Sequence, residues 1–293
     1  MMDQASNLRA IVKKQYQRDV NNARVISVTS GKGGVGKSSV SINLALQFRR
    51  MGKKVIILDV DFGLANIEVM FGVIPKYNLS DLIFSGKELK EIITEGPEGV
   101  GFISGGSGVA KMANLDKEQI KRLVNKLSEL EELADIIIID TGAGISPSVM
   151  EFLMASPETI IVTTPEPTSI TDSYALLKAL AMYEGFKSED KKIEVIANKV
   201  SSVDEGRNLY EKLNAVVSKF LDINLGFLGI IPQDNNISKA IMKQQPVSLM
   251  FPSSVSTKSF ESISKALDTN EDVVFKQKAG FRVFLKNVFG RKM

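Results

Sequence analysis

A mostly parallel β-sheet flanked by helices is the fold class that this sequence predicts, and three observations indicate it. Short apolar runs rich in β-branched residues alternate with longer segments of helical periodicity. Several runs end in acidic or amide residues, as expected where ligands gather at the carboxyl ends of parallel strands. The 293 residues, 44% of them hydrophobic, are enough to bury one large core.

Strand and helix signals alternate through most of the chain. Strands are predicted, in order, at 24–30, 55–61, 100–104, 135–140, 159–163, 192–197 and 226–231. The run at 135–140 contains four consecutive isoleucines, which suit a strand buried on both faces. Helices are predicted from apolar periodicity at 38–50, 168–182, 206–220 and 237–243.

The loop between the first strand and the first helix reads SGKGGVGKS at residues 30–38. Its spacing satisfies G-x-x-x-x-G-K-[ST], in which backbone N–H groups surround phosphates, the lysine neutralises them and the hydroxyl ligates Mg²⁺. Glycines are needed because a Cβ would obstruct the tight turn or the approaching phosphate. The residues predicted to bind the nucleotide are Gly31, Lys32, Gly33, Gly34, Val35, Gly36, Lys37, Ser38 and Ser39.

Acidic residues at two predicted strand ends complete the expected magnesium site. Asp140 ends the isoleucine run, where it can hold Mg²⁺ through a bridging water, together with the Ser38 hydroxyl. Asp59 and Asp61 are two positions apart at the end of the strand predicted at 55–61, so their side chains are expected on the same side of that strand.

Polar groups at two further strand ends are candidates for the nucleotide base. Asn198 follows the strand at 192–197, and the turn that contains Pro232 and Asp234 follows the last strand. The segment after Asn198 lacks the aspartate of the N-K-x-D pattern of GTPases, so guanine selectivity is not expected.

The full signature K-G-G-x-G-K-[ST], with Lys32 ahead of the paired glycines, resembles the deviant Walker A loop of the MinD/ParA family of P-loop ATPases. The resemblance implies an ATPase that forms a homodimer with ATP, in which Lys32 reaches the partner's phosphates. A cation supplied in trans makes hydrolysis depend on pairing, as an arginine finger does. Lys32 and Lys37 are therefore expected to act in catalysis.

The same resemblance assigns further roles. Asp61, in a D-x-D-x-G pattern, would orient or deprotonate the lytic water, and Asp59 would support the site. Asn66 would lie near the dimer interface, and Gly144 would belong to a switch that senses the γ-phosphate. Residues 165–172 resemble the family's loop over the nucleotide.

The basic C-terminal end carries an amphipathic pattern. Residues 276–293 have a net charge of +6 and residues 1–24 of +3, whereas the chain's total is only +3, so the body is acidic at −6. A helix at the end would suit an anionic membrane surface, with cations at the borders of an apolar stripe. Docking on the protein's own core is the alternative. The residues of this predicted membrane element are Phe281, Arg282, Phe284, Leu285, Lys286, Val288 and Phe289.

The N-terminal heptapeptide D-Q-A-x-x-L-R resembles the FlhG branch of the family, also called YlxH or FleN, which regulates flagellar number and placement. In that branch the N-terminal helix stimulates a signal-recognition-type GTPase, FlhF, and basal-body or C-ring proteins are further partners. The positions that match are Asp3, Gln4, Ala5, Leu8 and Arg9. The expected organisation is a partner-binding segment at 1–23, an ATPase domain at 24–267, and a linker with the membrane helix at 268–293.

Absent residues narrow the function. Without cysteine or histidine the chain has no disulfide, thiolate zinc site, iron–sulfur cluster or imidazole base. No signal peptide is apparent, so a cytoplasmic protein that binds peripherally to the inner face of the cell membrane is expected. The acidic body makes nucleic acid an unexpected partner. The alternatives are a division-site MinD-type ATPase, a partition ParA-type ATPase that coats DNA, and a nucleotide-gated scaffold with negligible turnover.

Overall fold

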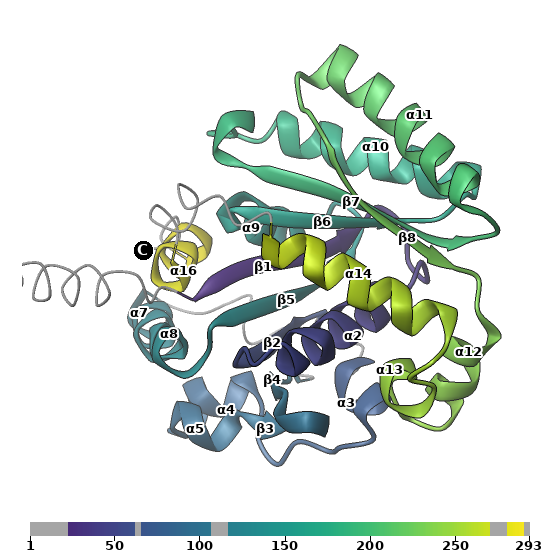
Figure 1. The fold of residues 1–293 in the computed structure, drawn as a ribbon. Helices are drawn as coiled ribbons and strands as arrows, with labels where there is room; N and C mark the ends of the chain where they lie inside the picture. Colours follow the sequence, from purple (N-terminus) through teal and green to yellow (C-terminus); the bar gives the residue numbers. More distant parts are fainter. Residues whose placement is uncertain (1–22, 62–65, 107–116, 270–279, 290–293) are drawn as a thin grey trace, which may run out of the picture.

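The computed structural model describes residues 23–61, 66–106, 117–269 and 280–289. They form one eight-stranded sheet with helices on both faces, which confirms the predicted fold class (Figure 1). The strand order is β3-β4-β2-β5-β1-β6-β7-β8, and every neighbouring pair is parallel except β3 with β4. The strands are β1 (Arg24–Ser30), β2 (Val55–Val60), β3 (Thr94–Glu95), β4 (Gly101–Ile103), β5 (Ile136–Ala143), β6 (Glu158–Thr163), β7 (Lys192–Val200) and β8 (Gly226–Pro232).

Helices connect the parallel strands and cover both faces. The larger ones are α2 (Lys37–Arg50), α7 (Lys117–Ser128), α9 (Pro147–Ala155), α10 (Pro167–Ala181), α11 (Val203–Leu221), α12 (Asn235–Met242), α14 (Val255–Thr269) and α16 (Phe281–Phe289). Shorter ones are α3 (Asn66–Phe71), α4 (Leu79–Phe84), α5 (Leu89–Ile92), α8 (Leu130–Leu133) and α13 (Val247–Met250). No helix among the described residues is long and apolar enough to cross a membrane.

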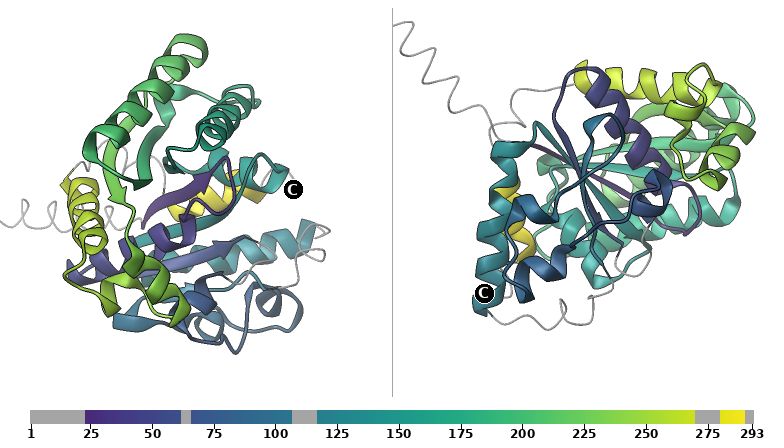
Figure 2. Two further views of the ribbon diagram at one scale, coloured as in Figure 1. Left: turned by 90° about the vertical axis from the view of Figure 1, so that its right-hand side faces the viewer. Right: turned by 90° about the horizontal axis from the view of Figure 1, so that it is seen from below.

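The central strands are buried on both faces, as the run of isoleucines predicted. Ile136 and Ile138 pack with α2 and α14 on one face, whereas Ile137 and Ile139 pack with α7, α9 and α16 on the other. Helices α10 and α11 extend the cover over β6 and β7. Figure 2 shows α14 and α16 on different sides of the molecule, with α16 alongside α7. This arrangement brings the ends of β1, β2 and β5 together at one edge.

Candidate functional site

The predicted phosphate loop lies between β1 and the N-terminus of α2. Gly36 caps the helix with φ of 100°, a left-handed conformation that favours glycine. Lys37 begins the helix and is buried, with 7% of its surface exposed. Burial lowers the pKa of Lys37, and the carboxylates of Asp140 and Asp61 oppose that shift. A helix N-terminus and a buried lysine together favour an anion at this point.

Gly31 shows how closely the loop is fitted to α10. A Cβ built on Gly31 would lie 2.1 Å from the carbonyl carbon of Asp172, whereas a Cβ on Gly33 would meet nothing within 4 Å. We expect Gly31→Ala to lower the free energy of unfolding by about 3 kcal/mol, because backbone atoms cannot move aside as a flexible side chain can. Gly33→Ala is the matched control and should cost less than about 1 kcal/mol. Urea unfolding of both variants would measure the difference, and equal losses would contradict the geometry.

The carboxylates of Asp59 and Asp140 lie side by side, because the two residues are register partners on β2 and β5. Asp140 is fully buried; its Oδ1 accepts a hydrogen bond of 2.7 Å from the Ser41 hydroxyl, while its Oδ2 has no partner among the described residues. Burial raises the pKa of Asp140 to about 6, although the nearby Ser38 and Ser41 hydroxyls lower it. Burial, and then the charge of Asp140, raise the pKa of Asp59 to about 8.

These two carboxylates fit a divalent cation. Asp140 Oδ2 is buried without a partner among the residues that the structure describes, and the Asp59 and Asp140 carboxyl groups do not readily ionise together. Both observations indicate that a cation would be stabilised at this position. No group of three Asp, Glu, His or Cys side chains in the described part of the chain could hold a metal alone. This is consistent with Mg²⁺, which keeps waters and takes ligands from substrate phosphates. Ser38 and Asp140 would hold the ion, with Asp59 beside them.

Asp61 lies just beyond β2, close to the loop lysine and the predicted switch. Its backbone N–H donates to Asp59 Oδ1 (3.0 Å), and its Oδ2 accepts a 3.3 Å hydrogen bond from Asn66 Nδ2. Burial raises the pKa of Asp61, and the charge of Lys37 opposes the shift. Gly144, with φ of 84°, donates its N–H to the carbonyl oxygen of Ser30 (2.9 Å), so the switch residue rests on the end of β1.

Lys32 is placed differently from Lys37. Its Nζ donates to Glu166 Oε2 (2.6 Å) and to Thr168 Oγ1 (2.8 Å), both at the start of α10. The side chains of Lys32 and Glu166 are 35% and 60% exposed. An exposed ion pair of this kind contributes about 1 kcal/mol or less, so Lys32 can exchange partners at little cost.

The residues predicted to contact the base have structural partners. The Asn198 amide donates to the carbonyl oxygen of Val35 (2.7 Å), and Asp234 accepts from the N–H of Asn236 (2.9 Å) at the N-terminus of α12. Pro232 ends β8 next to this turn. Base contacts through Asn198, Pro232 and Asp234 therefore stay predictions, and the structure shows Asn198 supporting the phosphate loop.

Sequence reasoning missed several residues that shape the site. Ser41, whose hydroxyl donates to Asp140, is one of them. It lies three positions after Ser38 and so on the same face of α2, and this spacing could have predicted that it reaches the site. Lys199 adopts φ of 58° and donates from Nζ to the carbonyl oxygen of Gly34 (2.8 Å). The contacts of Glu166 and Thr168 with Lys32 depend on how α10 packs, which no local pattern reveals.

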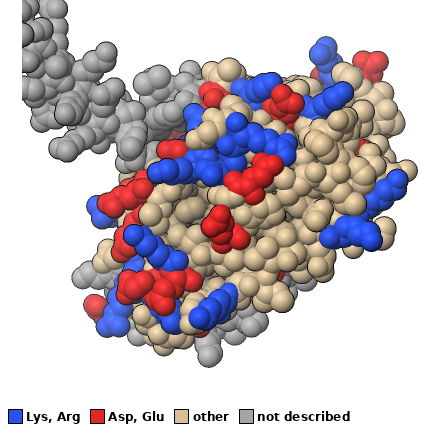
Figure 3. Space-filling view, turned by 60° about the horizontal axis from the view of Figure 1, so that its bottom comes forward, with Lys and Arg blue, Asp and Glu red and all other residues tan. Residues whose placement is uncertain are grey.

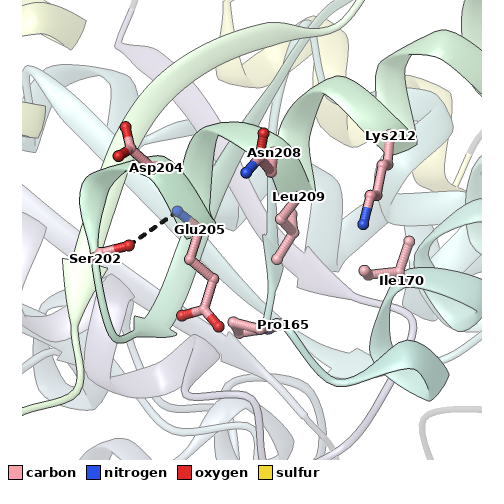
Figure 4. A pocket seen from close by; sticks show the side chains of 8 residues that line it. All are labelled: Pro165, Ile170, Ser202, Asp204, Glu205, Asn208, Leu209 and Lys212. Atoms are coloured by element: carbon pink, nitrogen blue, oxygen red, sulfur yellow. Dashed lines mark hydrogen bonds between the residues drawn. The ribbon is translucent and has the colours of Figure 1, made fainter.

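A cavity of about 400 Å³ lies between the starts of α10 and α11. Figure 4 shows apolar Pro165, Ile170 and Leu209 together with the charged side chains of α11. A hydrogen bond of 3.1 Å from the Glu205 N–H to the Ser202 hydroxyl closes the first turn of that helix. None of the lining residues belongs to the phosphate loop.

The C-terminal helix is docked in this structure. Phe281, Phe284, Leu285 and Val288 are at most 2% exposed and pack against α7 and α9, and the Phe284 ring stacks on Phe152 with centroids 6.0 Å apart. The stripe is therefore docked on the protein's own core in this structure, which was the alternative to a free helix; Phe289 is half-buried, and Arg282, Val283 and Lys286 are exposed. Membrane binding by these residues stays a prediction. Helix α14 continues to Thr269, so residues 268 and 269, where the linker was predicted to begin, are helical. The N-terminal positions Asp3 to Arg9 lie outside the described residues.

Comparisons with known proteins agree with this geometry. The ParA family model, described as NUBPL iron-transfer P-loop NTPase, matches residues 21–268. The antiactivator FleN of Pseudomonas aeruginosa is 41% identical over 246 residues, covering 84% of this chain and 86% of FleN. The flagellum site-determining protein YlxH of Helicobacter pylori is 35% identical over 91% of this chain and 90% of its own. The septum site-determining protein MinD of Pyrococcus horikoshii, complexed with Mg-ADP, superposes with a TM-score of 0.68 at 24% identity, covering 87% of this chain and 99% of its own.

Proposed function

This chain belongs to the ParA family of P-loop NTPases, and from that membership we propose that it is a Mg²⁺-dependent ATPase switch that pairs on ATP and regulates flagellar number or placement. The relatives named FleN and YlxH support the flagellar role. The site supports the ATPase, because phosphate loop, buried acidic pair and Asp61 converge at one sheet edge.

The different placement of the two loop lysines carries the proposal. Lys37 is buried at the start of α2, whereas Lys32 lies at the rim on a weak ion pair with Glu166. A lysine at the rim can leave Glu166 and complete the phosphate pocket of a second copy. Pairing and turnover would then be one event, because each pocket lacks a cation until the partner supplies it.

The residues divide the chemistry among themselves. Bound Mg²⁺ would neutralise the phosphates and stabilise the ionised form of Asp140, whose pKa burial raises. Asp61, half-buried beside Lys37, would hold the attacking water and accept its proton. Asn66 would keep the Asp61 carboxylate in place through its hydrogen bond.

The switch is connected to the C-terminal helix through α9. Gly144 precedes α9 by a few residues, and Phe152 on that helix stacks on Phe284 of α16. A rearrangement at Gly144 on ATP binding would shift α9 and release α16 to an anionic membrane. One short helix binds weakly, whereas a dimer presents two and gains avidity. The protein would thus be cytoplasmic at rest and peripheral on the inner membrane in the ATP state.

The charge on one face of the molecule gives no indication of a nucleic-acid partner. On the face in Figure 3, Lys and Arg side chains lie in groups that also contain Asp and Glu, with uncharged surface between the groups. Binding to a phosphodiester backbone requires a field of one sign, because counterion release supplies its free energy.

The N-terminal segment tests the flagellar assignment. We expect a peptide of residues 1–20 to raise the GTP hydrolysis rate of an FlhF-like GTPase at least about tenfold, because Gln4 can position water and Arg9 can add a charge contact. Gln4→Ala should remove most of the gain, and Gln17→Ala, outside the matching heptapeptide, should not. If the peptide does not raise the hydrolysis rate, and Gln4→Ala likewise makes no difference, this partner is wrong. C-ring proteins would then be the next candidates.

A further inference from the structure

The two ends of the chain carry the same nine-residue pattern. Residues 8–16 read LRAIVKKQY and residues 281–289 read FRVFLKNVF. Both have apolar residues at the first, fourth, fifth and ninth positions, arginine at the second and lysine at the sixth. A second copy of such a pattern is expected by chance in roughly one chain in thirty of this length and composition.

The C-terminal copy fills an apolar groove formed by α7, α9 and the start of β1. Its first, fourth and fifth side chains, Phe281, Phe284 and Leu285, are fully buried there. Its third residue, Val283, points outward with 41% of its surface exposed. The N-terminal copy, wound as a helix, would present Leu8, Ile11, Val12 and Tyr16 in the corresponding positions and Ala10 outward.

The N-terminal copy is attached at the groove itself. Ala23, the first described residue, belongs to the same apolar cluster as Phe281 and Phe284. Six residues separate Tyr16 from Ala23 and can extend about 20 Å, more than the roughly 13 Å length of a nine-residue helix. A tether of this length gives a high effective concentration at the groove.

Acidic residues lie at the rim of the groove, at the start of α16. Glu131 on α8 accepts a 2.6 Å hydrogen bond from the backbone N–H of Arg282, and Glu132 lies next to it. Arg9 and Lys13 stand in the N-terminal copy where Arg282 and Lys286 stand in α16.

We propose that residues 8–16 are a second occupant of the α16 groove and enter it when α16 leaves. At rest α16 holds the groove, because three phenylalanines bury more apolar surface and Gln15 replaces Val288 in the N-terminal copy. Once α16 is withdrawn, the N-terminal copy covers the apolar surface that would otherwise face water. The chain then presents one end at a time: the partner-binding segment when α16 is docked, and the membrane helix when residues 8–16 are docked. Only this last consequence rests on the proposed function.

Photo-crosslinking in the full-length chain tests the exchange. A benzophenone amino acid replaces Tyr16, and the double substitution Phe284→Asp, Leu285→Asp opens the groove without nucleotide, membrane or GTPase. We expect crosslinks from position 16 to α7 or α9, mapped by mass spectrometry, to rise at least about tenfold over the chain with native α16. The same label at Ala10 is the matched control and should give no such rise.

Two further variants serve as controls for the crosslinking experiment. A chain ending at Lys278 opens the groove without adding charge and should give the same crosslinks. Adding Leu8→Asp and Ile11→Asp to either opened chain should abolish them. Absence of groove crosslinks from position 16 in both opened chains, or equal crosslinks from positions 10 and 16, would overturn the proposal. The crosslinking assay contains no ATP, vesicles or GTPase. A negative crosslinking result would therefore not argue against the proposed ATPase switch, and a negative result for the ATPase switch would not argue against docking of residues 8–16 in the groove.

Discussion

Asp61→Ala is expected to lower the ATP hydrolysis rate at least about 100-fold while ATP-dependent pairing persists. In the proposed mechanism Asp61 holds the attacking water, since its carboxylate lies near Lys37 and outside the Asp59 and Asp140 pair. Removing a positioned base costs about 10²- to 10⁴-fold in rate. The phosphate loop and Lys32 are untouched, so the variant should accumulate as an ATP dimer.

Single-turnover hydrolysis and light scattering would measure the two effects on the same sample. Asp61→Asn keeps the size of the side chain and should be nearly as slow, because the amide cannot take a proton. Asp204→Ala, an exposed aspartate on α11, is the matched control and should hydrolyse ATP normally. Unchanged turnover in the Asp61 variants would assign the water to another group.

Phe152→Asp is expected to send the protein to anionic vesicles without ATP. Phe152 belongs to α9, is 6% exposed and stacks on Phe284. An unpaired carboxylate at position 152 should destabilise the docked state of α16 by about 3–5 kcal/mol. Burial of the four apolar α16 side chains stabilises that state by at most roughly 6–12 kcal/mol, so the loss is a substantial share. The apolar stripe of α16 is itself unchanged, so it remains able to bind lipid.

Vesicle flotation with ADP would measure the redistribution. Phe220→Asp, at an exposed phenylalanine on α11, controls for added charge and should leave the protein in solution. If Phe152→Asp loosens α16, shown by faster amide exchange in 281–289, and the protein still does not float, then α16 is a structural helix. The membrane role would then be wrong.

The sequence predicted the sheet well because its signal is local. Each central strand is an apolar run that is buried on both faces, and the isoleucines at 136–139 alternate between two clusters as a parallel strand must. Strand β3 was not predicted, since two residues pair with β4 through backbone groups alone. Helix α14 was also missed, although Phe260, Ile263 and Leu267 are spaced for one buried face.

Within the site, the loop motif could be predicted and its supports could not. Lys37 and Ser38 stand at fixed positions in a contiguous pattern. Ser41, Glu166 and Lys199 act through tertiary contacts with Asp140, Lys32 and Gly34, which depend on how separate elements meet. The stripe of α16 shows the same limit, because helical periodicity identifies an apolar face and does not say whether a groove or a membrane covers it.

The role of Lys32 in pairing can be measured as the molar mass of the Asp61→Ala chain with Mg²⁺ and ATP, with and without Lys32→Ala. Because Asp61→Ala is expected to block hydrolysis, the molar mass reports pairing without interference from ATP turnover. We expect about twice 32.1 kDa for Asp61→Ala and for the control Asp61→Ala, Lys178→Ala, and 32.1 kDa for Asp61→Ala, Lys32→Ala. If the Asp61→Ala, Lys32→Ala chain still pairs at the same ATP concentration, then no cation from Lys32 is needed in the partner's pocket and the proposed link between pairing and turnover is wrong.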